Sequence, residues 1–195
     1  PVASGFGHKE ALRLKMAAER KAAAAARPDA ARHASRVFLD HIPLTAGASI
    51  SLYHPLPDEI DTAPLAEELL RRGFPIALPV TPKRRAPLIF RSFREGDPLI
   101  ADRNGILTPD ESAPEVEPTV VVAPLLAFTR KGGRLGYGGG YYDRTIEALR
   151  NRKQILAVGF AYAAQEIEKL PMSKTDQYLD WIVTEREAIC TRAIK

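Results

Sequence analysis

The chain has 195 residues, enough for one domain at the usual size of about 100–200 residues. Its 45% apolar and 27% charged residues are ordinary for a soluble globular protein, and no apolar run approaches the roughly 20 residues that span a membrane. The first residues lack the apolar core of a signal peptide. Cys190 is the only cysteine in the sequence, so an internal disulfide is excluded. The net charge of +4 suits a protein that binds polyanions. We therefore expect a cytoplasmic protein.

Helices and strands alternate among the predicted elements. Residues 9–27 are rich in good helix formers, and Pro28 and Asp29 separate this helix from a second one at 30–41. The following predicted elements are strand 49–54, helix 62–72, strands 75–80, 88–94 and 119–123, helix 141–150, strand 155–160, a short helix at 164–170 and strand 181–183. Prolines and acidic residues are frequent between 96 and 118, so we expect an irregular excursion over the surface there.

This order of elements predicts the fold class. Strands separated by helices build a mostly parallel sheet that is covered on both faces. We expect an α/β protein: a single-domain, three-layer sandwich with a Rossmann-like central sheet over residues 1–195, with disorder expected at residues 1–8. In such sheets, ligands bind beyond the carboxyl ends of the strands.

The most informative segment is the loop at residues 132–144, where six of thirteen residues are glycine. It lies between a predicted strand and a predicted helix, so its backbone can approach a ligand closely and the free N–H groups of the helix start can bind an anion. Arg130, Lys131 and Arg134 add positive charge, and Asp143 in the first helical turn could hold a metal ion bound to a phosphate. The pattern predicts a phosphate-binding loop.

Standard nucleotide-binding fingerprints do not match this loop. A Walker A loop ends in Gly-Lys-Ser or Gly-Lys-Thr, but here Gly138 is followed by Gly139. A dinucleotide fingerprint would need a third glycine where the chain has Tyr141. A tight turn that packs a strand against a helix is the alternative, although such a turn needs only one or two glycines.

Together with the preceding Leu-Ala-Phe-Thr-Arg-Lys, the glycine loop resembles the C-terminal signature of the 5-formyltetrahydrofolate cyclo-ligase family, also called 5,10-methenyltetrahydrofolate synthetases. Four other segments resemble this family: residues 9–13 (KEALR), 50–62 (ISLYHPLPDEIDT), 72–80 (RGFPIALPV) and 157–184, which ends in D-x-x-L-D-x-I-V-T. The resemblance runs from about residue 9 to about residue 185. The glycine loop is highly specific, whereas the first segment is informative only in company with the others.

The resemblance implies a reaction and its partners. It implies that ATP and Mg²⁺ drive conversion of 5-formyltetrahydrofolate to 5,10-methenyltetrahydrofolate, with release of ADP and phosphate. The formyl oxygen would be phosphorylated and N10 of the folate would then attack the formyl carbon. We expect a monomer that binds these small molecules and neither nucleic acid nor a membrane.

The resemblance also implies the residues of the nucleotide site. Arg134 and Tyr142 would be catalytic, and Asp143 and Asp176 would hold Mg²⁺. The implied ATP-binding residues are Lys9, Arg13, Arg134, Leu135, Gly136, Tyr137, Gly138, Gly139, Gly140, Tyr141 and Tyr142. By themselves, Lys9 and Arg13 could equally form a solvated basic helix face, and Asp176 could be a turn or capping acid.

The implied folate-binding residues are His54, Glu59, Tyr137, Gly138, Gly139, Gly140 and Tyr141. A buried carboxylate such as Glu59 can accept hydrogen bonds from the amino and ring N–H groups of a pterin. The structural alternatives are that Glu59 is an N-terminal acid before a helix capped by Thr62, that His54 merely ends a strand, and that the tyrosines pack beneath the loop.

One position departs from the family pattern. Residues 105–109 read GILTP, with Thr108 where glutamate is usual, which puts details of substrate contact in question. Either the alignment shifts to Asp110 and Glu111, or this acid is dispensable. Two other functions remain open: a different ATP-dependent enzyme on the same scaffold, and a basic RNA-binding module centred on residues 83–85. A thermal shift with Mg·ATP and with 5-formyltetrahydrofolate would discriminate between them.

Overall fold

A seven-stranded sheet forms the centre of the computed structural model, which describes residues 3–83 and 85–194. The strand order is β11-β10-β9-β6-β1-β2-β3, and the four central pairings are parallel, while β3 and β11 join the two edges antiparallel. The strands are β1 (Ile50–Ser51), β2 (Ile76–Val80), β3 (Ile89–Phe93), β6 (Val120–Ala123), β9 (Leu156–Phe160), β10 (Trp181–Val183) and β11 (Ala188–Cys190). This sheet confirms the predicted α/β class.

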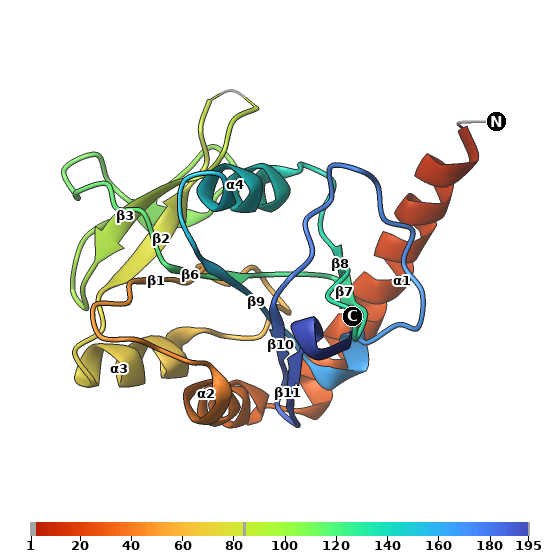
Figure 1. Ribbon diagram of the computed structural model, residues 1–195, viewed down its shortest axis with the longest axis horizontal. Coiled ribbons are helices and arrows are strands. Elements are labelled where there is room, and N and C mark those ends of the chain that lie inside the picture. Colours follow the sequence, from red (N-terminus) through yellow and green to blue (C-terminus); the bar gives the residue numbers. More distant parts are fainter. Residues whose placement is uncertain (1–2, 84, 195) are drawn as a thin grey trace.

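Helices cover both faces of the sheet, as Figure 1 shows. On one side lies α4 (Tyr141–Arg150), and on the other lie α2 (Ala30–His41) and α3 (Ala63–Arg71). The long α1 (Ala3–Ala26) runs past the end of the sheet near two short strands, β7 (Ala127–Phe128) and β8 (Arg134–Leu135). In the described part of the chain, no helix combines the length and the apolar character that crossing a bilayer requires.

Alternation along the strands divides the core into two layers. In β6, Val120 and Val122 pack in the cluster that contains α2 and α3, whereas Val121 packs in the cluster beneath α4. Because successive side chains of a strand point to opposite faces, one apolar run can serve both layers. The run of buried residues in β6 is therefore the sequence signature of a strand covered on both sides.

Several predicted boundaries were correct and others need correction. The bounds of α2, α4 and β10 are as predicted, but α1 begins at Ala3, so residues 3–8 are helical where we expected disorder. Of the predicted strand at 49–54 only Ile50–Ser51 pairs in the sheet. Residues 1–2, the start of the segment where disorder was expected, lie outside the described residues.

Three structured segments were not predicted. The excursion at 96–118 contains a hairpin of β4 (Leu99–Ala101) and β5 (Leu107–Pro109), β7 pairs with β8, and β11 follows β10. The predicted helix at 164–170 is only a 3₁₀ turn, Ala163–Gln165. The buried Gln165 amide donates to the carbonyls of Leu125 and Leu126. These bonds attach the 3₁₀ turn to the segment between β6 and β7.

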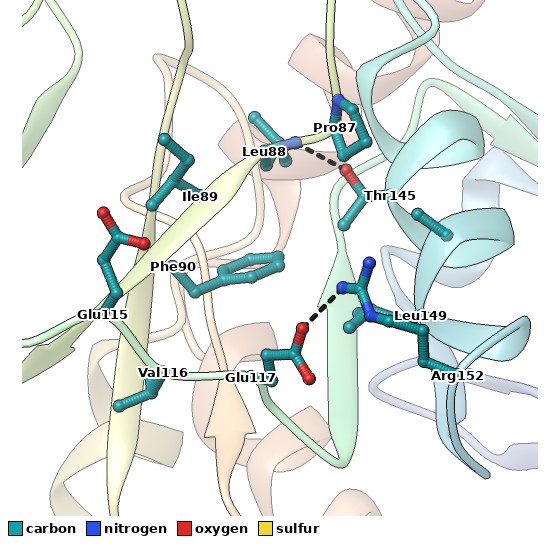
Figure 2. A pocket seen from close by; sticks show the side chains of 11 residues that line it. Pro87, Leu88, Ile89, Phe90, Glu115, Val116, Glu117, Thr145, Leu149 and Arg152 are labelled. Carbon is teal, nitrogen blue, oxygen red and sulfur yellow. Dashed lines mark hydrogen bonds and ion pairs between the residues drawn. The ribbon is translucent and has the colours of Figure 1, made fainter.

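A small pocket of about 250 Å³ separates β3 from α4 (Figure 2). The backbone N–H of Leu88 donates to the hydroxyl of Thr145 over 2.8 Å at one end of it. Arg152 pairs with Glu117 over 2.5 Å at the other end. The first contact joins the residue before the edge strand β3 to α4, and the second joins the segment before the central strand β6 to the segment after α4.

Candidate active site

A cleft of about 990 Å³ brings together segments that are far apart in the sequence. Its walls come from α1, the chain after β1, the loop between β8 and α4, and residues 171–176. The structure places every predicted site residue in the lining of this cleft: Lys9, Arg13, His54, Glu59, Arg134, Leu135, Gly136, Tyr137, Gly138, Gly139, Gly140, Tyr141, Tyr142, Asp143 and Asp176. The cleft lies beyond the carboxyl end of β1, where ligands bind in sheets of this kind.

The glycine loop enters the cleft from a hairpin rather than directly from a buried strand. Strand β8 pairs with β7, and the loop then runs to Gly140, which precedes α4 in the left-handed conformation at φ +68°. Gly138 also has a positive φ, +98°. Among the residues that the structure describes, no side chain caps the start of α4, so its first N–H groups are available to an anion.

Two glycines in this loop also leave no room for a side chain. A Cβ at Gly139 would lie 2.9 Å from Cδ2 of Tyr141, and one at Gly140 would lie 2.7 Å from Nη1 of Arg144. Arg144 donates from Nη2 to the Gly139 carbonyl, and its guanidinium lies 5.0 Å from the Tyr141 ring centroid. The loop is therefore closely packed as well as open to a ligand.

Arg134 is the loop cation that faces the cleft. Its Nη2 lies 3.2 Å from Oδ2 of Asp143, Nη1 donates to the Pro124 carbonyl, and its guanidinium lies 5.6 Å from the Tyr142 ring centroid. Its Nε is buried and has no partner among the described residues. A buried N–H without a partner is rare in proteins.

The other two cations that add positive charge to this loop do not line the cleft. Arg130 lies outside the cleft and pairs with Glu166 over 2.9 Å and with Glu187 over 2.5 Å. Lys131 is exposed and does not line the cleft either. The hairpin explains the difference, because Arg130 and Lys131 lie in the turn between β7 and β8, whereas Arg134 lies in β8.

The two predicted metal-binding carboxylates lie on neighbouring segments. Asp143 accepts a hydrogen bond of 2.9 Å from the backbone N–H of Gln177, the residue after Asp176. Asp176 pairs with Nζ of Lys9 over 2.8 Å and accepts a 2.7 Å bond from the N–H of Ser173. Burial raises the pKa of the Asp176 carboxyl, but the bonds from Lys9 and Ser173 outweigh it and the net pKa is lowered.

These carboxylates fit a magnesium ion that also binds phosphates, and they do not form a metal site by themselves. No group of three His, Cys, Asp or Glu side chains is arranged for a metal in the described ranges 3–83 and 85–194. Magnesium keeps several waters and takes one or two carboxylates beside substrate phosphates. Two aspartates in one cleft satisfy that need only when a phosphorylated ligand is present.

Helix α1 contacts the glycine loop directly. Nε of Arg13 donates to the Gly136 carbonyl over 3.0 Å, and Nη1 pairs with Glu10 over 3.0 Å. Lys9 lies one helical turn before Arg13 and pairs with Asp176. The helix thus presents two cations to the same end of the cleft as the start of α4, and the solvated-face alternative for this pair is wrong.

Glu59 occupies another part of the cleft wall and is nearly buried. Its side chain is 4% exposed, Oε2 accepts a 2.7 Å bond from the N–H of Leu56, and Oε1 accepts one from the hydroxyl of Tyr137. Burial raises the pKa of Glu59, against the lowering effect of the Tyr137 and Leu56 bonds and of Arg20. Asp58, immediately before it, has φ +65°, a strained conformation that often marks functional sites.

The capping alternative for Glu59 is not what the structure has. Asp61 Oδ1, not Glu59, accepts the N–H of Ala63 at the start of α3. Thr62 occupies the N-cap position as expected, but its hydroxyl donates to the Tyr53 carbonyl instead of capping the helix. Glu59 is therefore free of a helix-capping role.

Several cleft residues were not predicted from the sequence. Asn104 and Ile106 reach the cleft from the β4–β5 hairpin, and Arg144 reaches it from α4. Arg144 is the last residue of the glycine-loop segment 132–144, so its place in that segment was the available signal. Asn104 and Ile106 had no such signal, because the β4–β5 hairpin was not predicted from the sequence.

The unusual Thr108 has a structural role. It is buried, and its hydroxyl donates to the Pro79 carbonyl over 3.0 Å, which fixes β5 on β2. It is not among the described residues that line the cleft. Replacement of glutamate here therefore leaves the cleft charges described above unchanged.

Comparison with known proteins gives a consistent match. Residues 6–185 match the model of the 5-formyltetrahydrofolate cyclo-ligase family. The 5-formyltetrahydrofolate cyclo-ligase of Escherichia coli K12 is 33% identical over 158 residues, covering 78% of this chain and 86% of that protein. That of Haemophilus influenzae is 35% identical over 133 residues, covering 66% of this chain and 71% of that protein.

Solved structures agree with the sequence comparison. The Aquifex aeolicus 5,10-methenyltetrahydrofolate synthetase superposes with a TM-score of 0.75 at 29% identity, over 94% of this chain and 93% of that one. The Mycoplasma pneumoniae 5,10-methenyltetrahydrofolate synthetase shares the fold with a TM-score of 0.71 at 23% identity, over 91% and 99%.

Proposed function

We propose, for a chain that belongs to the 5-formyltetrahydrofolate cyclo-ligase family, that one cleft binds Mg·ATP beside the glycine loop and 5-formyltetrahydrofolate beside Glu59. The family supplies the activity, formation of 5,10-methenyltetrahydrofolate. The observation that supports the division of the cleft is the position of its charges. The cleft-lining cations Lys9, Arg13 and Arg134 contact Asp176, Gly136 and Asp143 near the start of α4. The buried Glu59 contacts a different residue of the glycine loop, Tyr137, and the N–H of Leu56.

The chemistry explains why ATP is needed. Amide-like resonance makes the N-formyl carbon a poor electrophile. Transfer of the γ-phosphoryl group of ATP to the formyl oxygen gives a phosphorylated iminium, and ADP leaves. N10 then attacks the activated carbon and releases its proton to solvent, the carbon–oxygen bond breaks, and the oxygen departs as part of inorganic phosphate. For these reaction steps the protein needs only to position the two substrates and to stabilise the developing charge, without a covalent enzyme intermediate.

At the nucleotide end, the protein groups would exchange partners when the substrate binds. Lys9 now pairs with Asp176, and Arg134 pairs with Asp143. The phosphates of ATP offer an anion to each of these cations, while a magnesium ion held by the two aspartates would neutralise charge on the phosphate oxygens. Gly138, Gly139 and Gly140 would bind phosphate oxygens through their backbone.

Arg134 and Tyr142 are the proposed catalytic residues. Arg134 lines the cleft, and its guanidinium can stabilise the charge that develops on the transferred phosphoryl group. The ring of Tyr142 lies beside the Arg134 guanidinium and limits its movement. The remaining proposed ATP contacts are Arg13, Leu135, Gly136, Tyr137 and Tyr141.

At the folate end, Glu59 would accept hydrogen bonds from the pterin N–H groups. Each carboxylate oxygen accepts one bond at present, and each has capacity for another. Tyr137 contacts Glu59 from the glycine loop, and His54 lines the same cleft. Tyr137, Tyr141 and the three consecutive glycines would therefore contact both substrates, which must meet for the transfer.

We further propose that the protein acts as a cytoplasmic monomer without a nucleic-acid partner. Exposed cations such as Arg130 and Arg152 are paired with acids, so the net charge of +4 is not concentrated in one stripe. Arg84, in the segment considered for RNA binding, lies outside the described residues. Light scattering of the purified protein tests the oligomeric state.

An isotope experiment tests the proposed mechanism. 5-Formyltetrahydrofolate with ¹⁸O in its formyl group is converted with Mg·ATP, and the released phosphate is analysed by mass spectrometry. We expect one labelled oxygen in each phosphate, because the formyl oxygen leaves with the transferred phosphorus. Unlabelled phosphate alongside normal methenyl product would show that another route expels the oxygen.

A further inference from the structure

A buried arginine lies behind the wall of the folate end of the cleft. Arg20 comes from α1, its side chain is 8% exposed, and it is not among the described residues that line the cleft. Its Nη1 lies 3.6 Å from Oε1 of Glu59 and donates to the hydroxyl of Tyr137. Tyr137 in turn donates to the same Glu59 oxygen. One cation from α1 therefore holds both a carboxylate near β1 and a tyrosine of the glycine loop.

Stability alone does not account for this arrangement. The Nε of Arg20 is buried and has no partner in the described part of the chain. A buried polar group without a partner destabilises the folded state, and more strongly when it is charged. A buried ion pair is often no more stable than apolar residues of similar volume. The arrangement is better explained by what its charge does at the cleft.

We propose that Arg20 is a positioning residue for the folate site, which keeps Glu59 charged and aimed into the cleft without touching the substrate. The proposal rests on the proposed folate role of Glu59. A hydrogen-bond acceptor for pterin N–H groups must be ionised to keep its full acceptor capacity. Burial opposes that state and raises the pKa of Glu59, whereas the bonds from Tyr137 and Leu56 and the positive charge of Arg20, 3.6 Å away, favour the ionised form.

Other groups that face Glu59 do not supply this charge. Tyr137 from the glycine loop, Tyr53 from the chain after β1 and Tyr142 from α4 all interact with Glu59 electrostatically. Burial, followed by the negative charge of Glu59, raises the pKa of all three hydroxyls, so they are neutral at physiological pH. The N–H of Leu56 donates a neutral hydrogen bond. Among these neighbours in the described residues, Arg20 is the one that places a positive charge beside Glu59.

The test compares the pH dependence of folate binding in four proteins. Calorimetry measures the Kd for 5-formyltetrahydrofolate without ATP, for the unaltered protein and for Arg20→Met, Glu59→Gln and the matched control Lys21→Met. Lys21 is the exposed neighbour of Arg20 on α1, so this control removes a charge from the same helix. Melting temperatures show that each variant is folded.

The expected result for Arg20→Met is a pH-dependent loss. Removing an opposite charge raises a carboxyl pKa by about 1–3 units, so binding should weaken roughly tenfold as the pH falls from about 8.5 to about 6.5 and recover at the higher pH. Lys21→Met should keep the profile of the unaltered protein. Glu59→Gln should bind weakly at every pH, because an amide does not titrate. A merely structural role for Arg20 would weaken binding equally at both pH values.

Two outcomes would overturn the proposal, and they are distinguishable. Weak binding by Glu59→Gln beside an unchanged profile for Arg20→Met removes the role of Arg20 and leaves that of Glu59. Normal binding by Glu59→Gln removes the folate role of Glu59 and the proposal with it, while the ATP end of the cleft is unaffected. If Arg20→Met does not fold, Arg20→Gln, which is neutral but keeps hydrogen-bond donors, should show the same shifted profile.

Discussion

Helix α4 borders two cavities that differ in what lines them. On the cleft side, its first residues meet glycine backbone, Arg134 and the carboxylates Asp143 and Asp176. On the other side, the small pocket against β3 is lined mainly by apolar side chains, with an exposed pair between Arg152 and Glu117 at its rim (Figure 2).

The difference separates charged residues at the protein surface from charged residues that line a cleft where a ligand can bind. The Arg152–Glu117 pair is about half exposed and contributes little, since such pairs are worth about 0–1 kcal/mol. In the cleft, Arg134 is 5% exposed and keeps an unpartnered Nε. Changes in the cleft should therefore alter binding and turnover, whereas changes at the small pocket should alter stability alone.

The largest expected effect is that of Asp143→Asn. The amide keeps the shape of the carboxylate but loses the charge that would hold magnesium beside the phosphates, so turnover should fall by roughly 100-fold or more. Steady-state rates across a range of Mg²⁺ concentrations measure the effect, and circular dichroism checks the fold. Near-normal activity at limiting Mg²⁺ would remove Asp143 from the metal site.

The next largest effect should come from Gly140→Val, which places a β-branched residue at φ +68° and a Cβ 2.7 Å from Arg144. Gly139→Val should act similarly through the Tyr141 ring. We expect ATP affinity, measured by calorimetry, to fall at least about tenfold and more than folate affinity. Gly96→Val is the matched control, because Gly96 has φ +86° in open space away from the cleft. Equal ATP affinities for the control and the loop variants would contradict the phosphate cradle.

Glu59→Gln should raise the KM for the folate and spare the KM for ATP. A lost charge-assisted hydrogen bond is worth about 1.5–3 kcal/mol, roughly ten- to a hundredfold in binding. Asp61→Asn is the control, since Asp61 rather than Glu59 accepts the N–H at the start of α3. The control should lose some thermal stability and keep both KM values. A normal folate KM for Glu59→Gln would leave His54 and the tyrosines to hold the pterin.

The smallest effect on function should come from Thr145→Val at the small pocket. The change leaves the N–H of Leu88 without its 2.8 Å acceptor, so the free energy of unfolding should fall by about 1–3 kcal/mol. Both KM values should stay within about twofold of normal, because no ligand contact is removed. Denaturant unfolding and steady-state kinetics on one preparation provide the comparison. A large change in the KM for ATP would show that the pocket and the cleft are coupled through α4.

Periodicity and motifs predicted the parts of the fold that are long or locally marked. Helix α4 follows a glycine-rich start and α2 follows a Pro-Asp break, so both bounds could be placed from the sequence. The hairpin of β7 and β8 could not, because each strand has two residues and is defined by pairing across the turn. An alternating pattern needs at least four residues to be recognised.

The site shows the same contrast between local and non-local information. The position of the glycine loop in the wall of the cleft could be predicted, because its residues are consecutive in the sequence. Arg20 was missed, although a signal existed: it lies seven residues after Arg13 and eleven after Lys9, spacings that return to the same helix face. Its contact with Glu59 joins positions 39 residues apart, which no local pattern specifies.

The most direct test of the account is the reaction itself. Purified protein is mixed with 5-formyltetrahydrofolate, ATP and Mg²⁺, and the near-ultraviolet absorbance of the methenyl product is followed while ADP is measured in the same samples. We predict one ADP for each methenyl group formed and no product when either ATP or Mg²⁺ is omitted. Absence of product from folded protein with all three present, or product formation without ATP, would contradict the assignment of the cleft.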